Sequence, residues 1–98
     1  MRRKTVQELV KEIVGEDPCI LIDDSEESRK ALEIVKDFER KYGLEGYIRV
    51  FRWTRREPSD YLPALFVDGP FIPCEGVERI KWYFNVYVPH EIEERLKK

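Results

Sequence analysis

The first third of the chain changes from a helical to a strand-like pattern of apolar residues. Residues 5–8 (Thr-Val-Gln-Glu) fit a capping box, and apolar residues then recur at helical spacing as far as Gly15. A glycine in that place commonly ends a helix, and Pro18 blocks any continuation. The run Cys19–Ile22 is short and entirely apolar, which is typical of a central strand buried on both faces.

A second helix and a second strand follow. Asp24 or Ser25 can cap the helix, whose apolar face repeats until Gly43 ends it. Residues 47–54 are rich in aromatic and β-branched side chains, so they are predicted to form a strand. Arginines on both faces of that strand indicate an edge position, because charge discourages unwanted pairing there.

The last forty residues predict a hairpin and two helical segments. Two apolar runs, residues 64–67 and 71–72, are joined by Asp-Gly at 68–69, a strong hairpin signal. A helical segment follows Gly76, and a short final helix is expected to start at Pro89. The predicted order is helix, strand, helix, strand, strand, strand, helix, helix, and the strand–helix–strand unit makes the first two strands parallel.

Length and composition narrow the class of protein. Ninety-eight residues suit a single domain, 1–98, and 42% apolar residues with a net charge of −2 argue against disorder. The charge balance also makes nucleic-acid binding an unfavoured function. No apolar run approaches the roughly 18 residues of a membrane span, so we expect a cytoplasmic protein. Because charged residues abound and only Gln7 and Asn85 carry side-chain amides, a thermophilic source is a hypothesis.

The order βαβ-ββα, with Pro63 opening the hairpin, resembles the thioredoxin fold, and glutaredoxins most closely. The resemblance covers a core of about residues 19–84 and leaves an extra N-terminal helix and a short C-terminal helix. Residues 62–69 (Leu-Pro-Ala-Leu-Phe-Val-Asp-Gly) look like the family's cis-proline strand and turn, and residues 71–76 lead into its last helix. The fold class predicted is therefore α/β and thioredoxin-like, with a four-stranded mixed sheet.

The family's catalytic motif is replaced. Where the resemblance places a Cys-x-x-Cys pair, this chain has Ser25-Glu26-Glu27-Ser28. Thiol–disulfide exchange needs a thiolate, which a hydroxyl cannot supply. The neighbouring carboxylates, Asp23 among them, would also raise the pKa of any nearby thiol. The ordinary dithiol mechanism is therefore excluded.

A second departure concerns the path of the chain. The family has a helix between its second and third strands, whereas here only residues 55–62 connect Thr54 to Pro63. One face of the sheet is expected to lack its usual helix. Either the N-terminal helix or the segment after Pro89 would cover it, and a glutathione groove of the usual shape is in doubt.

The two cysteines are interpreted separately. In the resembling topology Cys19 starts the first strand, far from the replaced motif, and Cys74 ends the hairpin at the near end, so no disulfide between them is expected. Cys19 is interpreted as a buried apolar residue. Cys74 should lie within reach of Ser25 and Pro63, as a structural thiol or, alternatively, as a reactive one.

Other clusters have structural explanations. One strip of residues could bind phosphate or single-stranded nucleic acid. Alternatively, its arginines could form ion pairs with the acidic residues 23–27. The strip consists of Arg49, Phe51, Arg52, Trp53, Arg55 and Arg56. Helix capping explains the acidic residues without a metal, and His90 is expected to be exposed.

The leading hypothesis is a redox-inactive module that binds a protein partner or forms a homodimer, with no cofactor, metal or membrane. Surplus aromatic residues at 82–88 support an interface. The alternative is a thiol oxidoreductase that uses Cys74 alone with glutathione, and a weaker one is nucleic-acid binding by residues 49–56. The residues predicted to bind are Ser25, Ser28, Trp53, Arg55, Arg56, Leu62 and Pro63.

Overall fold

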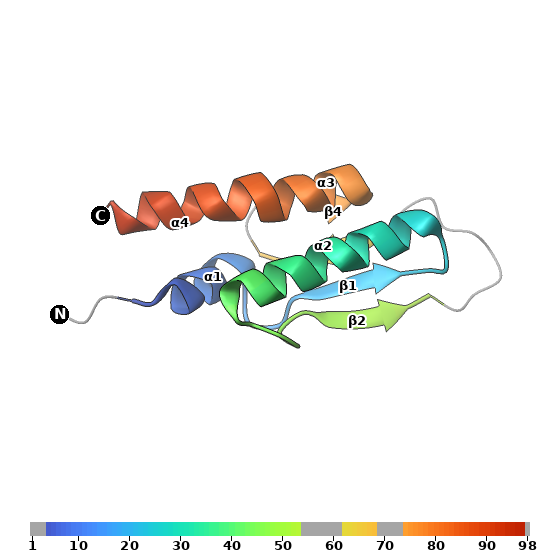
Figure 1. Ribbon diagram of the computed structural model, residues 1–98, viewed down its shortest axis with the longest axis horizontal. Coiled ribbons are helices and arrows are strands. Elements are labelled where there is room, and N and C mark those ends of the chain that lie inside the picture. Colours follow the sequence, from blue (N-terminus) through green and yellow to red (C-terminus); the bar gives the residue numbers. More distant parts are fainter. Residues whose placement is uncertain (1–3, 54–61, 69–73, 98) are drawn as a thin grey trace.

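A computed structural model describes residues 4–53, 62–68 and 74–97, which form an α/β fold with a four-stranded mixed sheet (Figure 1). The strands are β1 (Cys19–Ile22), β2 (Arg49–Arg52), β3 (Ala64–Phe66) and β4 (Cys74–Glu75). The helices are α1 (Val6–Val14), α2 (Glu26–Tyr42), α3 (Val77–Trp82), the π-helix η1 (Tyr83–Tyr87) and α4 (Val88–Leu96).

The sheet has the order β2-β1-β3-β4. Strands β1 and β2 are parallel and are joined by α2, whereas β3 is antiparallel to both of its neighbours. The predicted mixed sheet and the edge position of β2 are confirmed. Strand β2 covers Arg49–Arg52 of the expected 47–54, and Thr54 lies outside the described residues. The strand starts after Ile48, whose backbone N–H donates to the buried Glu39 carboxylate at 3.0 Å.

Helix ends follow the capping residues of the sequence. Thr5 accepts a hydrogen bond from the Glu8 N–H, and Ser25, rather than Asp24, caps α2 by accepting one from the Ser28 N–H. Gly43 ends α2 in the left-handed conformation, with φ of 65°, which a residue without a Cβ adopts at little cost.

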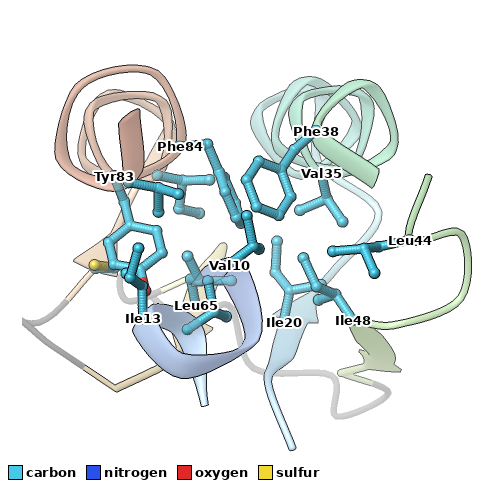
Figure 2. Close-up of a cluster of buried hydrophobic side chains, with 14 of the residues drawn as sticks. Val10, Ile13, Ile20, Val35, Phe38, Leu44, Ile48, Leu65, Tyr83 and Phe84 are labelled. Atoms are coloured by element: carbon cyan, nitrogen blue, oxygen red, sulfur yellow. The ribbon is translucent and has the colours of Figure 1, made fainter. Parts of the chain in front are cut away.

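Helix α2 and the α3–α4 segment form a layer above the sheet. Figure 1 shows α2 lying over β1 and β2, with the α3–α4 segment beside it and α1 near the end where β1 begins. Figure 2 shows Phe38 of α2 and Phe84 of η1 pointing toward one another above Ile20 of β1, and the two ring centroids are 4.4 Å apart. Val10 of α1 enters the same core. Burial of these apolar side chains holds the two layers together.

The second face of the sheet differs from the expectation. Both α1 and α4 join the core on the α2 side and contact one another, so within the described residues no helix covers the opposite face. On that face Phe51 and Phe66 are 48% and 55% exposed. Strand β1 is therefore buried on one face and only half-buried on the other, and the expectation of burial on both faces is wrong.

The C-terminal segment is one continuous helix from Val77 to Leu96, not two separate helices (Figure 1). Pro89 has no N–H and its ring crowds the preceding turn, so an unbroken α-helical ladder is not possible there. The chain widens into the π-helix η1 just before the proline, where the Val88 N–H donates to the carbonyl of Tyr83. This local widening lets the helix continue past Pro89.

The hairpin is confirmed, but its register is not that of a two-residue turn. A turn at residues 68–69 would place Leu65 opposite residue 72, whereas Leu65 pairs with Cys74. The connection is longer because β3 already ends at Phe66, and the Asp68 N–H donates to Val14 O at 2.9 Å. The expected strand residues 71–72 lie outside the described residues.

In the described part of the chain, no helix combines the length and apolar character needed to cross a membrane.

Candidate functional site

The candidate site lies at the edge of the sheet where β1 ends. There Trp53 donates its backbone N–H to Ile22 O at 2.6 Å, and Gly76 donates its N–H to Pro63 O at 2.7 Å. These bonds bring the ends of β1 and β2 and the beginnings of β3 and α3 to one edge, next to the start of α2. Most of the residues predicted to bind are thus gathered at this edge: Ser25, Ser28, Trp53, Leu62 and Pro63. Arg55 and Arg56 lie outside the described residues.

Ser28 and Asp23 form a closed pair at the start of α2. The Ser28 hydroxyl donates to Asp23 Oδ1 at 2.8 Å and accepts from the Asp23 N–H at 3.0 Å. Ser28 is 0% exposed, and its own N–H donates to Ser25 Oγ at 3.2 Å. The Ser25 N–H donates to Asp23 Oδ1 at 2.9 Å. Both serine hydroxyls are therefore engaged in hydrogen bonds: that of Ser25 caps α2, and that of Ser28 binds Asp23.

This network favours the ionised form of Asp23. Hydrogen bonding by Ser25, through its side chain and then its backbone, and by the Ser28 hydroxyl lowers the pKa of Asp23 below its ordinary value. Sequence reasoning treated Asp23 only as one of the acidic residues 23–27, with no hydrogen-bonding role of its own. Its spacing from Ser25 is the pattern of an Asx turn, which is the sequence feature that identifies its role.

The residues just before β3 are largely buried or hydrogen-bonded within the protein. The bond between Leu62 and Pro63 is cis, as the resemblance implies, and both residues are buried. The Pro63 carbonyl is already occupied by Gly76. A peptide at this position would have to use other backbone groups.

A depression of about 380 Å³ lies between the start of α2 and the start of α3. The residues that line it are Glu27, Lys30, Glu75, Gly76, Val77, Glu78 and Arg79. Three carboxylates and two cations share this surface, so its charges favour neither an anionic nor a cationic ligand. Sequence reasoning missed it because its residues come from three separate elements.

Cys74 is a buried thiol. It is 5% exposed, faces the core beside Leu65, and belongs to the same apolar cluster as Tyr83. Burial raises the pKa of the Cys74 thiol, an effect that the nearby Arg79 only partly offsets. A low thiolate fraction is the opposite of what a nucleophilic cysteine requires.

Neither Cys19 nor Cys74 forms a disulfide, and the two do not lie at opposite ends of the sheet. Cys74 pairs with Leu65, which pairs with Ile20, so the two cysteines are one position apart along the strands. That part of the sequence reasoning is wrong because Cys74 pairs with Leu65, and it is Gly76, not Cys74, that reaches the site edge. The thiols are instead separated by β3 and lie on opposite faces, because successive strand residues alternate.

Contrary to the expectation, the arginines of β2 do not form ion pairs with the acidic residues 23–27. Arg49 lies 3.4 Å from Asp17, at the other end of β1, and the Asp23 carboxylate is engaged by serines. Arg49 and Arg52 are three positions apart and point to opposite faces of the sheet. A strip with both arginines on one face does not form.

In the described part of the chain, no group of three or more His, Cys, Asp or Glu side chains is arranged to hold a metal ion. Comparisons with family models, curated proteins and solved structures gave no match to this chain.

Proposed function

We propose that this chain is a thioredoxin-like domain without thiol chemistry, which binds a protein partner or a second copy of itself. The observation that carries the proposal is the buried Ser28, hydrogen-bonded to Asp23 at the place where the resembling family has its thiol pair. The βαβ-ββα order of the described elements supports the thioredoxin-like assignment.

The chemistry of the replaced site supports a loss of activity. A serine hydroxyl forms no disulfide. The Ser25 hydroxyl caps α2, and the Ser28 hydroxyl is hydrogen-bonded to Asp23. The alternative, a glutathione-linked oxidoreductase that uses Cys74, would need an accessible thiolate. Cys74 is buried and its pKa is raised, so this alternative is less well supported.

The exposed face of the sheet supports binding. Phe51 lies beside Leu21, and Phe66 lies beside Cys19, on a face that no described helix covers. Exposed apolar surface of this kind often marks an interaction site. In this reading the scaffold keeps its fold and uses its surface instead of a thiol.

Two measurements on the whole chain test the proposal. Glutathione-linked disulfide reduction is compared between the wild type and Cys74→Ser, and self-association is followed by light scattering over a wide range of concentration. Cross-linking in extract of the source cells, competed by unlabelled protein, reports on partners. We expect no turnover above the Cys74→Ser background, together with either a dimer or a competed cross-linked complex. Cys74-dependent turnover, or a monomer with no competed complex, would contradict the proposal.

A further inference from the structure

Strand β2 has one free side. It is the outermost strand of the order β2-β1-β3-β4, and β1 is its single neighbour in the sheet of described residues. All four of its residues are exposed, including Val50 at 42% and Phe51 at 48%. An exposed edge strand is a template on which another strand can pair.

The backbone groups on this free side can be assigned from the ladder. The N–H groups of Arg49 and Trp53 donate inward, to Pro18 O and Ile22 O at 3.0 and 2.6 Å. Residues of a strand direct their backbone groups alternately to its two sides. Val50 and Arg52 therefore direct their N–H and C=O groups outward, which provides four hydrogen-bonding groups to an added strand.

The side chains at this edge carry positive charge. Arg49 and Arg52 bracket Val50 and Phe51, and β2 contains no acidic residue. The ion pair of Arg49 with Asp17 joins two side chains that are 64% and 71% exposed. Such exposed pairs contribute little, so Arg49 can exchange this partner for another carboxylate.

We propose that the free edge of β2 binds an extended acidic segment of a partner protein, which pairs with Val50 and Arg52 as an added strand. The proposal rests on the proposed function, because it names the partner of a protein-binding module. The segment would carry two carboxylates three positions apart, opposite Arg49 and Arg52. Main-chain hydrogen bonds would supply affinity, and the two charge pairs would select the sequence.

The charges of β2 favour this occupant over two others. Pairing β2 with a second copy would bring four arginines together with no carboxylate from either strand, and like charges destabilise a strand pair. A nucleic acid would need cations along one surface, whereas Arg49 and Arg52 point to opposite faces of a chain whose net charge is −2.

The test uses an array of short capped peptides in which two glutamates are fixed three positions apart and the other positions vary among β-branched residues. Binding is measured by fluorescence anisotropy, with lysine in place of both glutamates as the control array. We expect members of the glutamate array to bind, and their lysine counterparts to bind at least about tenfold more weakly. Equal binding by both arrays, or by neither, overturns the proposal.

Three variants locate the surface. Val50→Pro removes an outward N–H but leaves the inward bonds of Arg49 and Trp53, so the β1–β2 ladder is kept. We expect Val50→Pro and Arg52→Glu each to weaken the glutamate peptides at least about tenfold. Lys36→Glu, an equal charge change on the exposed face of α2, should change affinity less than about twofold. Circular dichroism checks that each variant folds, and Arg52→Glu keeps the test open if Val50→Pro unfolds.

The outcomes separate this inference from the proposed function. If no glutamate peptide binds but the chain still forms a competed complex without thiol turnover, only the β2 proposal fails. Binding of a single-stranded oligonucleotide that is lost in Arg52→Glu, with no peptide binding, would also overturn it and favour nucleic acid. Cys74-dependent turnover would contradict the proposed function whatever the peptides do.

Discussion

Replacing Ser28 by alanine is expected to lower the free energy of unfolding by about 2 kcal/mol, because two side-chain hydrogen bonds are lost at about 1 kcal/mol each. The first is donated to Asp23 Oδ1 at 2.8 Å, and the second is accepted from the Asp23 N–H at 3.0 Å. Ser28 is fully buried, so water cannot replace the hydroxyl without rearrangement.

Urea unfolding is the direct assay. With a slope of about 1–3 kcal/mol per molar, a loss of 2 kcal/mol moves the midpoint down by about 1 M. The corresponding fall in melting temperature is roughly 10 °C. Asp24→Ala is the matched control, because Asp24 is an exposed neighbouring carboxylate, and we expect it to change stability by less than about 0.5 kcal/mol.

The effect of Ser28→Ala should also depend on pH. Because the folded-state pKa of Asp23 lies below the ordinary value of 3.8, the stability it contributes is present above that value and is lost as pH falls through the folded pKa. Without the Ser28 hydroxyl the pKa of Asp23 rises toward 3.8, so the cost of the substitution is full at neutral pH and shrinks below about pH 4. If Ser28→Ala matched the Asp24→Ala control, or left the Asp23 titration unchanged by NMR, the account of this network would be refuted.

Two further substitutions test other contacts that shape the fold. Glu39→Ala should lower the free energy of unfolding in urea by about 2 kcal/mol, because it leaves the Ile48 N–H without its acceptor. The control Glu33→Ala, on the exposed face of α2, should lower it by less than about 0.5 kcal/mol. Equal losses in the two variants would contradict this role of Glu39. Tyr83→Phe should cost about 1 kcal/mol at neutral pH through loss of the hydrogen bond to Asp68 O at 3.0 Å. Burial raises the pKa of Tyr83 above its ordinary 10.0, so ionisation of this tyrosine favours the unfolded state above about pH 10. The difference in unfolding free energy between wild type and Tyr83→Phe should therefore narrow above that pH. A difference that stays constant in alkaline urea unfolding would contradict this expectation.

The elements that sequence predicted correctly are those marked by local chemistry. Thr5 was recognisable as a cap, and the second cap was narrowed to Asp24 or Ser25, because these residues stand before a helical repeat. Gly43 was recognisable as a helix end because it follows such a repeat. The edge position of β2 was readable from arginines on both of its faces. Such features depend on residues close together in the chain, so no knowledge of the packing was needed.

The features that sequence missed depend on distant partners. Glu39 follows Phe38 on α2 and reads as a solvated charge, and only the return of the chain places Ile48 N–H against it. The longer hairpin connection and the exposed side of the sheet were also hidden, because register and layer contacts are set by tertiary packing. The site was found in part: its serines follow from the resemblance, whereas the role of Asp23 and the depression beside Glu27 needed the assembled structure.

The alkylation rate of Cys74 as a function of pH, in a Cys19→Ser background, tests the central claim most directly. Burial raises the pKa of this thiol, so we predict either no labelling before unfolding or a midpoint above the reference of about 8.5. That result would mean that Cys74 is not an activated thiol, as the proposal of a redox-inactive binding module predicts. Rapid labelling of the folded chain with a midpoint well below the reference would show an activated thiolate at Cys74 and contradict the claim.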